Sequence, residues 1–253
     1  MADSTVLILT PMKSASRYLD GYFRQLESLT YRHELISLAI LEGDSSDDTL
    51  AQIQSRLQTT CTRFRKKSIF KKDFGFIIPE GTPRFEAVYQ PQRRAILAKA
   101  RNHLLFRALD DEDWVLWLDV DVVEYPDDIL EHLVGLDLDI VHPHCVNDYG
   151  GKSFDLNAWR DNGRFHMDDM RGSGRVRLDS VGGTMLLVRA ERHRDGLVFP
   201  PFFYGERSRW VRAPNPWQGG HVGEIETEGF AAMAKDMGIE CWGLPDLEIL
   251  HSK

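Results

Sequence analysis

The chain has 253 residues, of which 42% are apolar and 28% are charged, a composition typical of a globular protein with one sizeable core. Its formal net charge of −8 argues against binding nucleic acid or an anionic membrane through charge alone. Three widely separated cysteines exclude a cysteine-based zinc site, and no apolar run approaches the roughly 18 residues of a transmembrane helix, so we expect a soluble chain without a membrane span.

The first predicted elements alternate between short strands and helices. Val6–Leu9 predicts a buried strand that ends at Thr10-Pro11, and apolar residues at three- and four-residue steps predict a helix after it. Leu35–Leu41 predicts the second strand, which an acidic turn containing Asp44 follows. Strand, helix and strand joined by short turns are typical of a parallel sheet, whose ligands bind at the carboxyl ends of the strands.

The longest predicted helix leads into the predicted central strand. The helix is Gln92–Leu109, with Arg101 on its charged side, and the strand is Trp114–Val123, an apolar run of the kind buried on both faces. Because side chains two residues apart on a strand point the same way, we expect Asp119 and Asp121 on one face at its carboxyl end. Such carboxylates repel unless a cation lies between them, which predicts Mg²⁺ or Mn²⁺ carrying a substrate phosphate. A solvated strand end is the alternative, because Asp-x-Asp is a short motif.

Several segments admit two interpretations. The basic cluster Arg63–Lys72 is interpreted as a solvated face rather than a phosphate contact. Loop 146–177 is expected to be an ordered excursion or a mobile lid, and the aromatic residues of loop 199–222 either stack on sugars or pin the loop. Gly183, just before the predicted strand Met185–Val188, either permits close backbone approach to a ligand or marks a bulge.

Carboxylates and a histidine appear near the C-terminus. Glu226 and Glu228 precede the predicted helix Phe230–Met237. They are either acids favoured by the helix dipole or catalytic candidates. His251 stands just beyond the last predicted strand, Leu247–Leu250.

We predict one α/β domain over residues 1–253, with a mixed, mainly parallel sheet flanked by helices. Residues 1–125 are expected to be its nucleotide-binding half. Residues 126–253 are expected to be its acceptor half, which contains both long loops.

Seven segments carry a family resemblance. They read VLILTPMKSASRYLDGYFRQL, LISLAILEGDSSDDT, ARNHLLFRAL, WVLWLDVDVV, LDSVGGTMLLVRAERHRDGLVFP, IETEGFAAMAKDMG and CWGLPDLEILH. In these segments and their order, the chain resembles the fungal mannan polymerase (Anp1-type) family of Golgi α-1,6-mannosyltransferases. The resemblance implies the GT-A fold, a Rossmann-like fold that binds nucleotide sugars. The two long loops match least, and the anchor and stem of the Golgi members are missing from this sequence.

The resemblance also implies a reaction and its ligands. A metal-dependent, retaining transferase of this kind moves mannose from GDP-mannose to a hydroxyl of a glycan or small acceptor and forms an α-linkage. By resemblance, Asp121 coordinates Mn²⁺ (or Mg²⁺) directly, His251 is the third protein ligand, and Asp119 binds the ribose or the metal through water. Glu226 and Glu228 orient the acceptor hydroxyl or stabilise the oxocarbenium ion, and no residue is assigned as a nucleophile.

The remaining candidate residues are expected around the donor. Thr10, Pro11 and Asp44 would line its nucleotide end, with Asp44 hydrogen-bonding the ribose or the base. Arg101 would lie near the phosphates, or alternatively form a salt bridge on the helix surface. Gly183 would belong to the floor of the sugar pocket.

Two other functions stay open at this point. The same fold can use another nucleotide hexose, because the choice of base and sugar rests on a few pocket contacts. The second open function is that of a non-catalytic subunit, which binds a nucleotide sugar or glycan within a polymerase complex. Such a complex is a homo- or hetero-oligomer. The compartment is expected to be the cytoplasm for a soluble chain, or the Golgi lumen for a catalytic domain separated from its anchor.

Overall fold

The computed structural model describes residues 4–79, 81–83, 86–208, 210–211, 214–215 and 221–252. Within them, one sheet contains the strands β1 (Val6–Met12), β2 (Ile36–Glu42), β3 (Lys66–Lys71), β4 (Trp114–Leu118), β5 (Val122–Glu124), β6 (Ile140–Val146), β9 (Val176–Leu178), β10 (Met185–Arg189) and β13 (Cys241–His251). They lie in the order β3-β2-β1-β4-β10-β6-β13-β5, and β9 also pairs with β13. Two small ribbons pair β7 (Trp159–Arg160) with β8 (Phe165–His166) and β11 (Pro214–Asn215) with β12 (His221–Val222).

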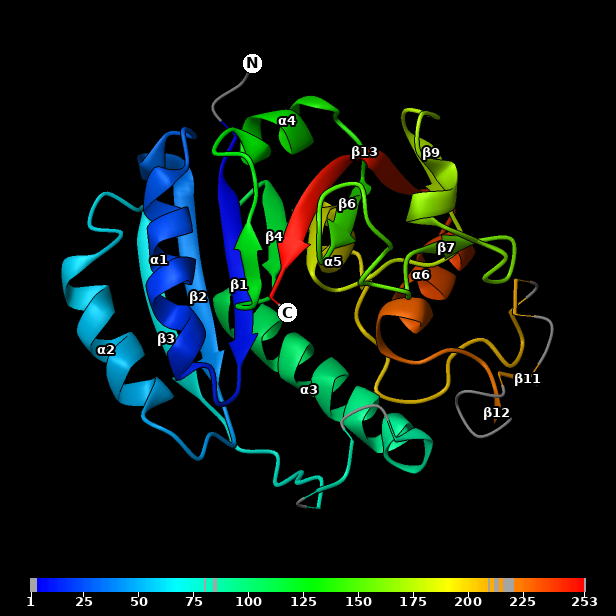
Figure 1. Ribbon diagram of the computed structural model, residues 1–253, viewed down its shortest axis with the longest axis horizontal. Coiled ribbons are helices and arrows are strands. Elements are labelled where there is room, and N and C mark those ends of the chain that lie inside the picture. Colours follow the sequence, from blue (N-terminus) through cyan, green and yellow to red (C-terminus); the bar gives the residue numbers. More distant parts are fainter. Residues whose placement is uncertain are drawn as a thin grey trace.

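Helices flank the sheet (Figure 1). The α-helices are α1 (Leu19–Ser28), α2 (Thr49–Thr59), α3 (Gln90–Ala108), α4 (Ile129–Gly135), α5 (Ala190–Arg194) and α6 (Glu226–Asp236). Short 3-10 turns occur at Ser16–Tyr18, His33–Leu35, Ala87–Tyr89 and Met167–Met170. Among the helices described here, none has both the length and the apolar character needed to cross a bilayer. The mixed sheet flanked by helices confirms the predicted α/β fold class.

The directions of the strands place many carboxyl ends at one edge of the sheet. β1 is parallel to β2 and β4, and β2 is parallel to β3, as the short strand–helix–strand pattern predicts. β10 is antiparallel to β4 and β6, and β13 is parallel to β6. β1, β2, β3, β4, β6 and β13 therefore end at the edge where β10 begins. Ligands of α/β proteins bind at such an edge.

Alternating side chains on β4 separate the two layers of the core. Trp114, Leu116 and Leu118 belong to a core that includes residues of α1, α2 and α4. Val115 and Trp117 belong to a second core, with residues of α3 and α6. All five side chains are buried, which explains why this strand is a continuous apolar run rather than an alternating one.

The basic cluster Arg63–Lys72, interpreted from sequence as a solvated face, contains the edge strand β3. Arg65 donates to both oxygens of the Asp111 carboxylate, at 2.8 and 2.6 Å, and Lys66 donates to Asp110 at 2.7 Å. The positive charges therefore bind the acidic turn after α3. Lysines on an edge strand also discourage pairing with another chain.

Candidate active site

Asp119 and Asp121 lie in the turn after β4 rather than on the strand. The strand ends at Leu118, and its pairing with β1 ends one residue earlier. The Val122 N–H donates to the Asp119 carbonyl at 3.2 Å and closes the turn. The predicted strand alternation therefore does not apply to the two aspartates, and this part of the sequence prediction is wrong. Both residues nevertheless lie at the carboxyl edge of the sheet, where they were expected.

The Asp119 carboxylate is surrounded by other charged groups. A nitrogen of the Arg101 guanidinium lies 3.5 Å from it, and 33% of the Asp119 side chain is accessible. Burial of the carboxyl group raises the pKa of Asp119 to about 7; Arg101 opposes the rise, while the charges of Asp121 and Asp155 add to it. A nearby cation would therefore stabilise the ionised form of this carboxyl group.

His251 faces Asp121 across the edge of the sheet. It is the last residue of β13, not a residue beyond the strand as predicted, because it pairs with Val122 of β5. Its Nε2 lies 3.2 Å from the Asp121 carboxylate, and its ring stacks on Phe154 with centroids 3.6 Å apart. Burial alone would lower the pKa of His251, but the hydrogen bond and the charge of Asp121 outweigh it and raise that pKa.

Two arginines of α3 bind the two glutamates at the start of α6. Arg101 forms an ion pair with Glu226, and Arg94 lies 2.6 Å from Glu228. The indole N–H of Trp159 donates to the other oxygen of Glu228 at 3.3 Å. Arg101 does form ion pairs, as one of the two alternatives expected, but it is only 5% exposed, so they are buried rather than on the helix surface. The glutamates and arginines form one buried network that reaches Asp119.

The start of α6 has an unusual backbone. The helix begins at Glu226 and not at Phe230, as the sequence suggested. Glu226 has φ of 62°, in the left-handed region, and its N–H donates to the Pro200 carbonyl at 3.0 Å. A non-glycine residue in this region costs about 1–3 kcal/mol, and such strain is concentrated at functional sites. The surrounding ion pairs hold Glu226 in this conformation.

Gly183 lies between two charged side chains. A Cβ atom at Gly183 would collide with the Arg101 guanidinium, and one at Gly182 would collide with the Asp155 carboxylate. The room provided by this glycine pair is therefore occupied by protein side chains. Asp155 was not among the sequence candidates, since a single aspartate in a loop rich in Gly, Asp, Asn and Arg carries no distinguishing signal.

Loop 146–177 supplies three residues to the site. They are Phe154 on His251, Asp155 beside the glycine pair, and Trp159 on Glu228. The isolated aromatic residues of this loop were the one sequence signal for such packing. Loop 199–222 lies partly outside the described residues, and Trp217, expected to stack on sugars or pin that loop, is among those left out.

The predicted nucleotide end has two different kinds of residue. Thr10 is fully buried and its hydroxyl lies 2.6 Å from that of Tyr22, so its side chain packs toward α1. Pro11 is partly exposed. The Asp44 carboxylate accepts hydrogen bonds from the backbone N–H groups of Phe74 and Gly75, both at 2.9 Å, and orders the segment after β3. Donor binding by these residues stays a prediction.

The donor set can be tested against the expected cation. Among the residues described, no group of three or more His, Cys, Asp or Glu side chains is arranged as a preformed metal site. The Asp121 and His251 side chains contact each other, and the Asp119 carboxylate pairs with Arg101. The chemical type of these groups, hard carboxylate oxygens with one imidazole nitrogen, suits Mn²⁺ or Mg²⁺. The residues therefore fit the ion chemically, and a cation would replace the Asp121–His251 contact.

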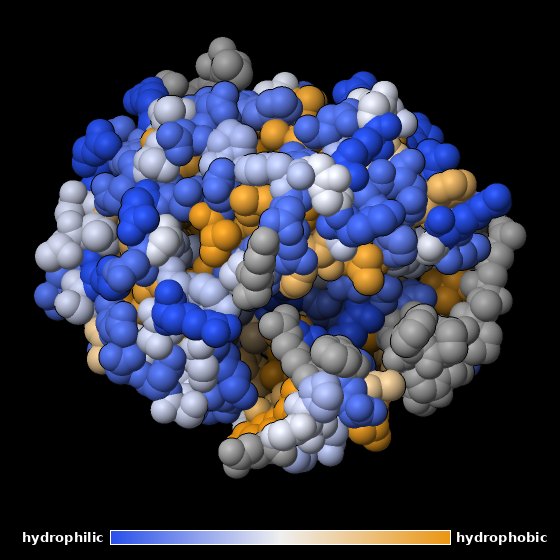
Figure 2. Space-filling view, viewed as in Figure 1, coloured by the Kyte–Doolittle hydropathy of each residue, from blue (hydrophilic) through white to orange (hydrophobic). Residues whose placement is uncertain are grey.

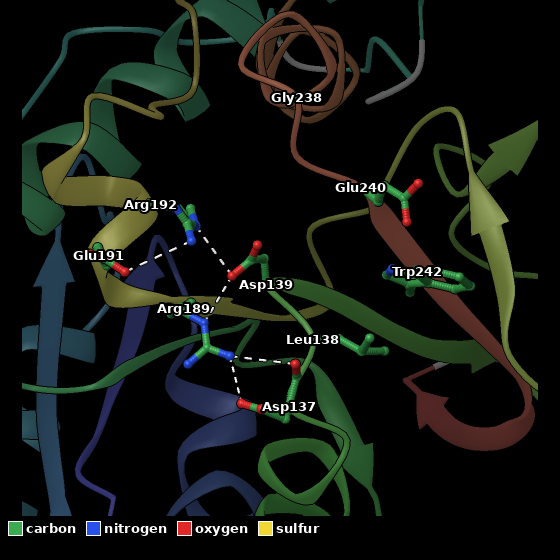
Figure 3. Close-up of a pocket in the computed structure, with 9 residues that line it drawn as sticks. All are labelled: Asp137, Leu138, Asp139, Arg189, Glu191, Arg192, Gly238, Glu240 and Trp242. Carbon is green, nitrogen blue, oxygen red and sulfur yellow. Dashed lines mark hydrogen bonds and ion pairs between the residues drawn. The ribbon is translucent and has the colours of Figure 1, made fainter.

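The face viewed in Figure 2 is hollowed near its centre, and hydrophilic residues line the recess. This recess lies beside the place where Figure 1 shows the C-terminal end of β13. A different hollow, of about 700 Å³, lies at the opposite edge of the sheet (Figure 3). Arg189 binds Asp137 and Asp139 there, and Arg192 binds Asp139 and Glu191. This second hollow lies away from the edge where β1, β2, β3, β4, β6 and β13 end, so it is not where ligands of α/β proteins bind.

Comparisons of the sequence with known proteins identify a family. A family model described as Anp1 matches residues 1–171 and 161–203. The chain is 32% identical to the mannan polymerase II complex anp1 subunit of Schizosaccharomyces pombe and to the mannan polymerase complex subunit MNN9 of Candida albicans. Each match covers 97% of this chain, but 63% of the first relative and 74% of the second. The chain therefore spans only part of the length of these relatives.

Solved structures show the same fold. Staphylococcus aureus TarS in complex with UDP has a TM-score of 0.58 at 12% identity, over 98% of this chain and 60% of TarS. The mannosyltransferase PcManGT from Pyrobaculum calidifontis, in complex with GDP-Man and Mn²⁺, has a TM-score of 0.57 at 14% identity, over 98% of this chain and 56% of PcManGT. These similarities establish the GT-A glycosyltransferase fold. Together with the sequence matches, they show that the chain belongs to the Anp1 family, some of whose members are named as subunits of mannan polymerase complexes.

Proposed function

We propose that this chain is the transferase domain of a metal-dependent, retaining α-mannosyltransferase. Its donor would be GDP-mannose and its acceptor a hydroxyl of a glycan or small molecule. The observation that carries the proposal is the convergence of Asp119, Asp121 and His251 at the carboxyl edge of a GT-A sheet. Two acidic groups and an imidazole beside a polar recess suit a diphosphate that arrives with a divalent cation.

Asp121 and His251 would hold Mn²⁺ or Mg²⁺, and Asp119 would bind the ribose or a water on the metal. The ion supplies Lewis-acid stabilisation of the diphosphate leaving group. Phe154 keeps the His251 ring in one orientation by stacking on it. The Asp121 contact fixes the position of its Nε2 atom. These side chains thus prepare the position where charge develops in the reaction.

Glu226 and Glu228 would act on the sugar side of the site. Their carboxylates are fixed by Arg101 and Arg94, and an anchored carboxylate can orient an acceptor hydroxyl or stabilise an oxocarbenium ion. Retention requires attack from the face that the diphosphate leaves, or a covalent intermediate, and we assign no nucleophile. Arg101 would also lie within reach of donor phosphates through its place beside Asp119.

The mannosyl and guanine parts of the proposal are supported by the family. Relatives named for mannan polymerase complexes cover nearly the whole chain, and a mannosyltransferase of the same fold binds GDP-Man and Mn²⁺. TarS, which has the same fold, binds UDP, so the fold itself leaves the base open. The names of the relatives also support a hetero-oligomeric complex, and a non-catalytic subunit of such a complex is the second candidate function.

Donor hydrolysis tests the proposal without knowledge of the acceptor. The purified chain is incubated with GDP-mannose and Mn²⁺, with a UDP-hexose and Mn²⁺, and with each donor plus EDTA, and released nucleotide is measured. We expect slow hydrolysis of GDP-mannose that needs Mn²⁺ and is lost in Asp121→Asn. Mn²⁺-dependent hydrolysis of the UDP-hexose instead would show that the donor is a UDP sugar and not GDP-mannose. Tight GDP binding with no turnover of any donor would favour the non-catalytic subunit.

A further inference from the structure

Asp155 is a buried carboxylate, and one of its oxygens accepts hydrogen bonds only from residues beside the site. It is 8% exposed and lies in the segment after β6. One of its oxygens accepts from the Gly183 N–H at 2.9 Å, from the Thr184 N–H at 3.4 Å and from the Thr184 hydroxyl at 3.3 Å. The other accepts from the Asn157 N–H at 3.1 Å. A carboxylate that accepts several N–H bonds fixes the backbone that donates them.

The backbone fixed by Asp155 continues directly to Asp119. The Thr184 carbonyl accepts a hydrogen bond from the Asp119 N–H at 2.9 Å, one residue beyond the last pair of β4 and β10. Asp155, Thr184 and Asp119 therefore form a short relay of hydrogen bonds. A displacement of the Asp155 carboxylate releases Thr184 and, through its carbonyl, the main chain of the Asp119 turn.

The glycine pair before Thr184 makes this arrangement possible. A Cβ atom on Gly182 would overlap the Asp155 carboxylate, and one on Gly183 would overlap the Arg101 guanidinium. Neither glycine has a positive φ, so space rather than backbone conformation requires glycine at both positions. The two residues let an anion and a cation approach the same stretch of backbone from different elements.

A histidine on β6 supports the buried anion. The His142 side chain is fully buried, and its Nε2 lies 3.7 Å from Asp155. Burial by itself would raise the pKa of Asp155, but His142 and the backbone N–H groups outweigh it and lower that pKa to about 2. The carboxylate thus keeps its full capacity to accept hydrogen bonds over the working range of pH.

We propose that Asp155 is a positioning residue of the transfer reaction, which holds the Gly183–Thr184 backbone and, through the Thr184 carbonyl, the Asp119 turn. The inference rests on the proposed function. Asp155 itself touches no reacting atom in this account. It fixes the positions of Asp119 and Gly183 before the donor binds. Preorganisation of this kind can increase the reaction rate and the metal affinity by large factors.

Two variants test the relay by different means. Asp155→Asn keeps the shape of the side chain and removes its charge, whereas Gly182→Ala keeps the charge and pushes the carboxylate aside. Asp168→Asn is the matched control, since Asp168 is a carboxylate of the same segment, only 7% of its side chain is accessible, and it accepts from the N–H and hydroxyl of Ser153. Its hydrogen bonds do not involve Thr184 or Asp119.

Hydrogen–deuterium exchange gives a readout that needs no activity. We expect amides of residues 181–186 and 118–121 to exchange at least about fivefold faster in both test variants, since each loses hydrogen bonds worth about 1 kcal/mol or more. Asp168→Asn should loosen residues 152–154 and leave these two stretches unchanged. Unchanged exchange at residues 118–121 in both test variants would overturn the relay.

Binding and turnover then show whether the relay serves the reaction. We expect the Mn²⁺-dependent affinity for GDP to fall about 10–100-fold in Asp155→Asn and Gly182→Ala. Faster amide exchange together with wild-type GDP affinity and wild-type donor hydrolysis would show that Asp155 has only a structural role and does not serve the reaction. A wild-type chain that fails to bind GDP at all would overturn the proposed function instead, while the exchange result would still stand on its own.

Discussion

Charged side chains at the site are held by partners far away in the sequence. Arg101 on α3 contacts both Asp119 after β4 and Glu226 on α6, and Arg94 holds Glu228. Removing one partner of a buried ion pair costs about 3–5 kcal/mol, because the other charge is left uncompensated. Substitutions that keep the shape of a side chain are therefore the informative ones, and each needs a stability measurement beside the functional one.

The Asp121 carboxylate should decide metal binding. We expect Asp121→Asn to weaken Mn²⁺-dependent GDP binding at least about a hundredfold, since losing even an outer partner of a metal site costs 10–100-fold. Isothermal calorimetry with GDP at fixed Mn²⁺ measures this. Asp128→Asn, an exposed residue in the same part of the chain, is the control for loss of one negative charge. Equal GDP affinity in Asp121→Asn and wild type would contradict the metal assignment.

Glu228 should affect turnover more than donor binding. Glu228→Gln keeps a partner for the Trp159 indole but removes the charge that Arg94 binds. If the carboxylate stabilises the transition state, kcat falls by about 10²-fold or more while KM for the donor changes little. The double variant Arg94→Gln/Glu228→Gln removes the uncompensated arginine and controls for stability. A changed KM with normal kcat would make Glu228 a residue of ground-state binding.

Sequence reasoning found the metal candidates but not the residues that hold them. Asp119 and Asp121 were placed at one edge because they follow an apolar run, which is a local signal, and the family resemblance added His251 to them. Arg101 was placed on a helix face, and its burial depends on Asp119 and Glu226, which lie far along the chain. Asp155 was missed for the same reason: its role depends on backbone groups of Gly183 and Thr184 that only the fold brings near.

At the scale of elements, β4 packs on α5 through a buried polar contact. The Trp117 indole N–H donates to His193 Nε2 at 3.2 Å, and His193 Nδ1 lies 2.7 Å from the Leu197 carbonyl. This pairing requires the neutral ring with its proton on Nδ1. Burial lowers the pKa of His193 to about 4, which is below the ordinary value for histidine.

This contact predicts a loss of stability in acid. Because the folded pKa of His193 lies below its unfolded value, its contribution is complete above about pH 6.5 and is lost as pH falls toward about 4. The loss is expected to reach up to about 3 kcal/mol, at about 1.4 kcal/mol per pKa unit. Urea unfolding at pH 7, 5.5 and 4.5 measures it. His193→Gln should flatten this dependence, and His132→Gln, on the exposed side of α4, should not. Identical acid slopes in all three proteins would contradict the assignment.

The boundaries of helices and strands were predicted best for apolar elements and least well for elements that contain charged residues. The apolar runs of β1, β2 and β10 and the periodic helix α3 were found within a few residues. β3 was missed because its lysines hide the strand pattern, and their partners come from other segments: Asp110 and Asp111 for Lys66, and backbone carbonyls of Leu57 and Thr60 for Lys67. The predicted range of the last helix, Phe230–Met237, left Glu226 to Gly229 before it, whereas the structure includes them in α6, and the ion pairs that hold Glu226 and Glu228 there are tertiary.

At the scale of the whole molecule, one sheet brings groups from both halves of the chain to one edge. The turn after β4 comes from the first half, while His251, Glu226 and the glycine pair come from the second. The predicted fold class followed from the order of strands and helices. The antiparallel strand β10 between β4 and β6 could not be read from that order, because the pairing of strands distant in the sequence is decided by the fold.

The most direct test of the account is thermal unfolding of the purified chain with GDP plus Mn²⁺, with UDP plus Mn²⁺, and with each component alone. A ligand at a hundredfold excess over its dissociation constant stabilises the folded state by about 2.7 kcal/mol. For a domain of this size, that should raise Tm by about 5–10 °C. We predict this rise with GDP only when Mn²⁺ is present. A rise with UDP instead, or no rise with either nucleotide, would contradict a metal-dependent GDP-mannose site.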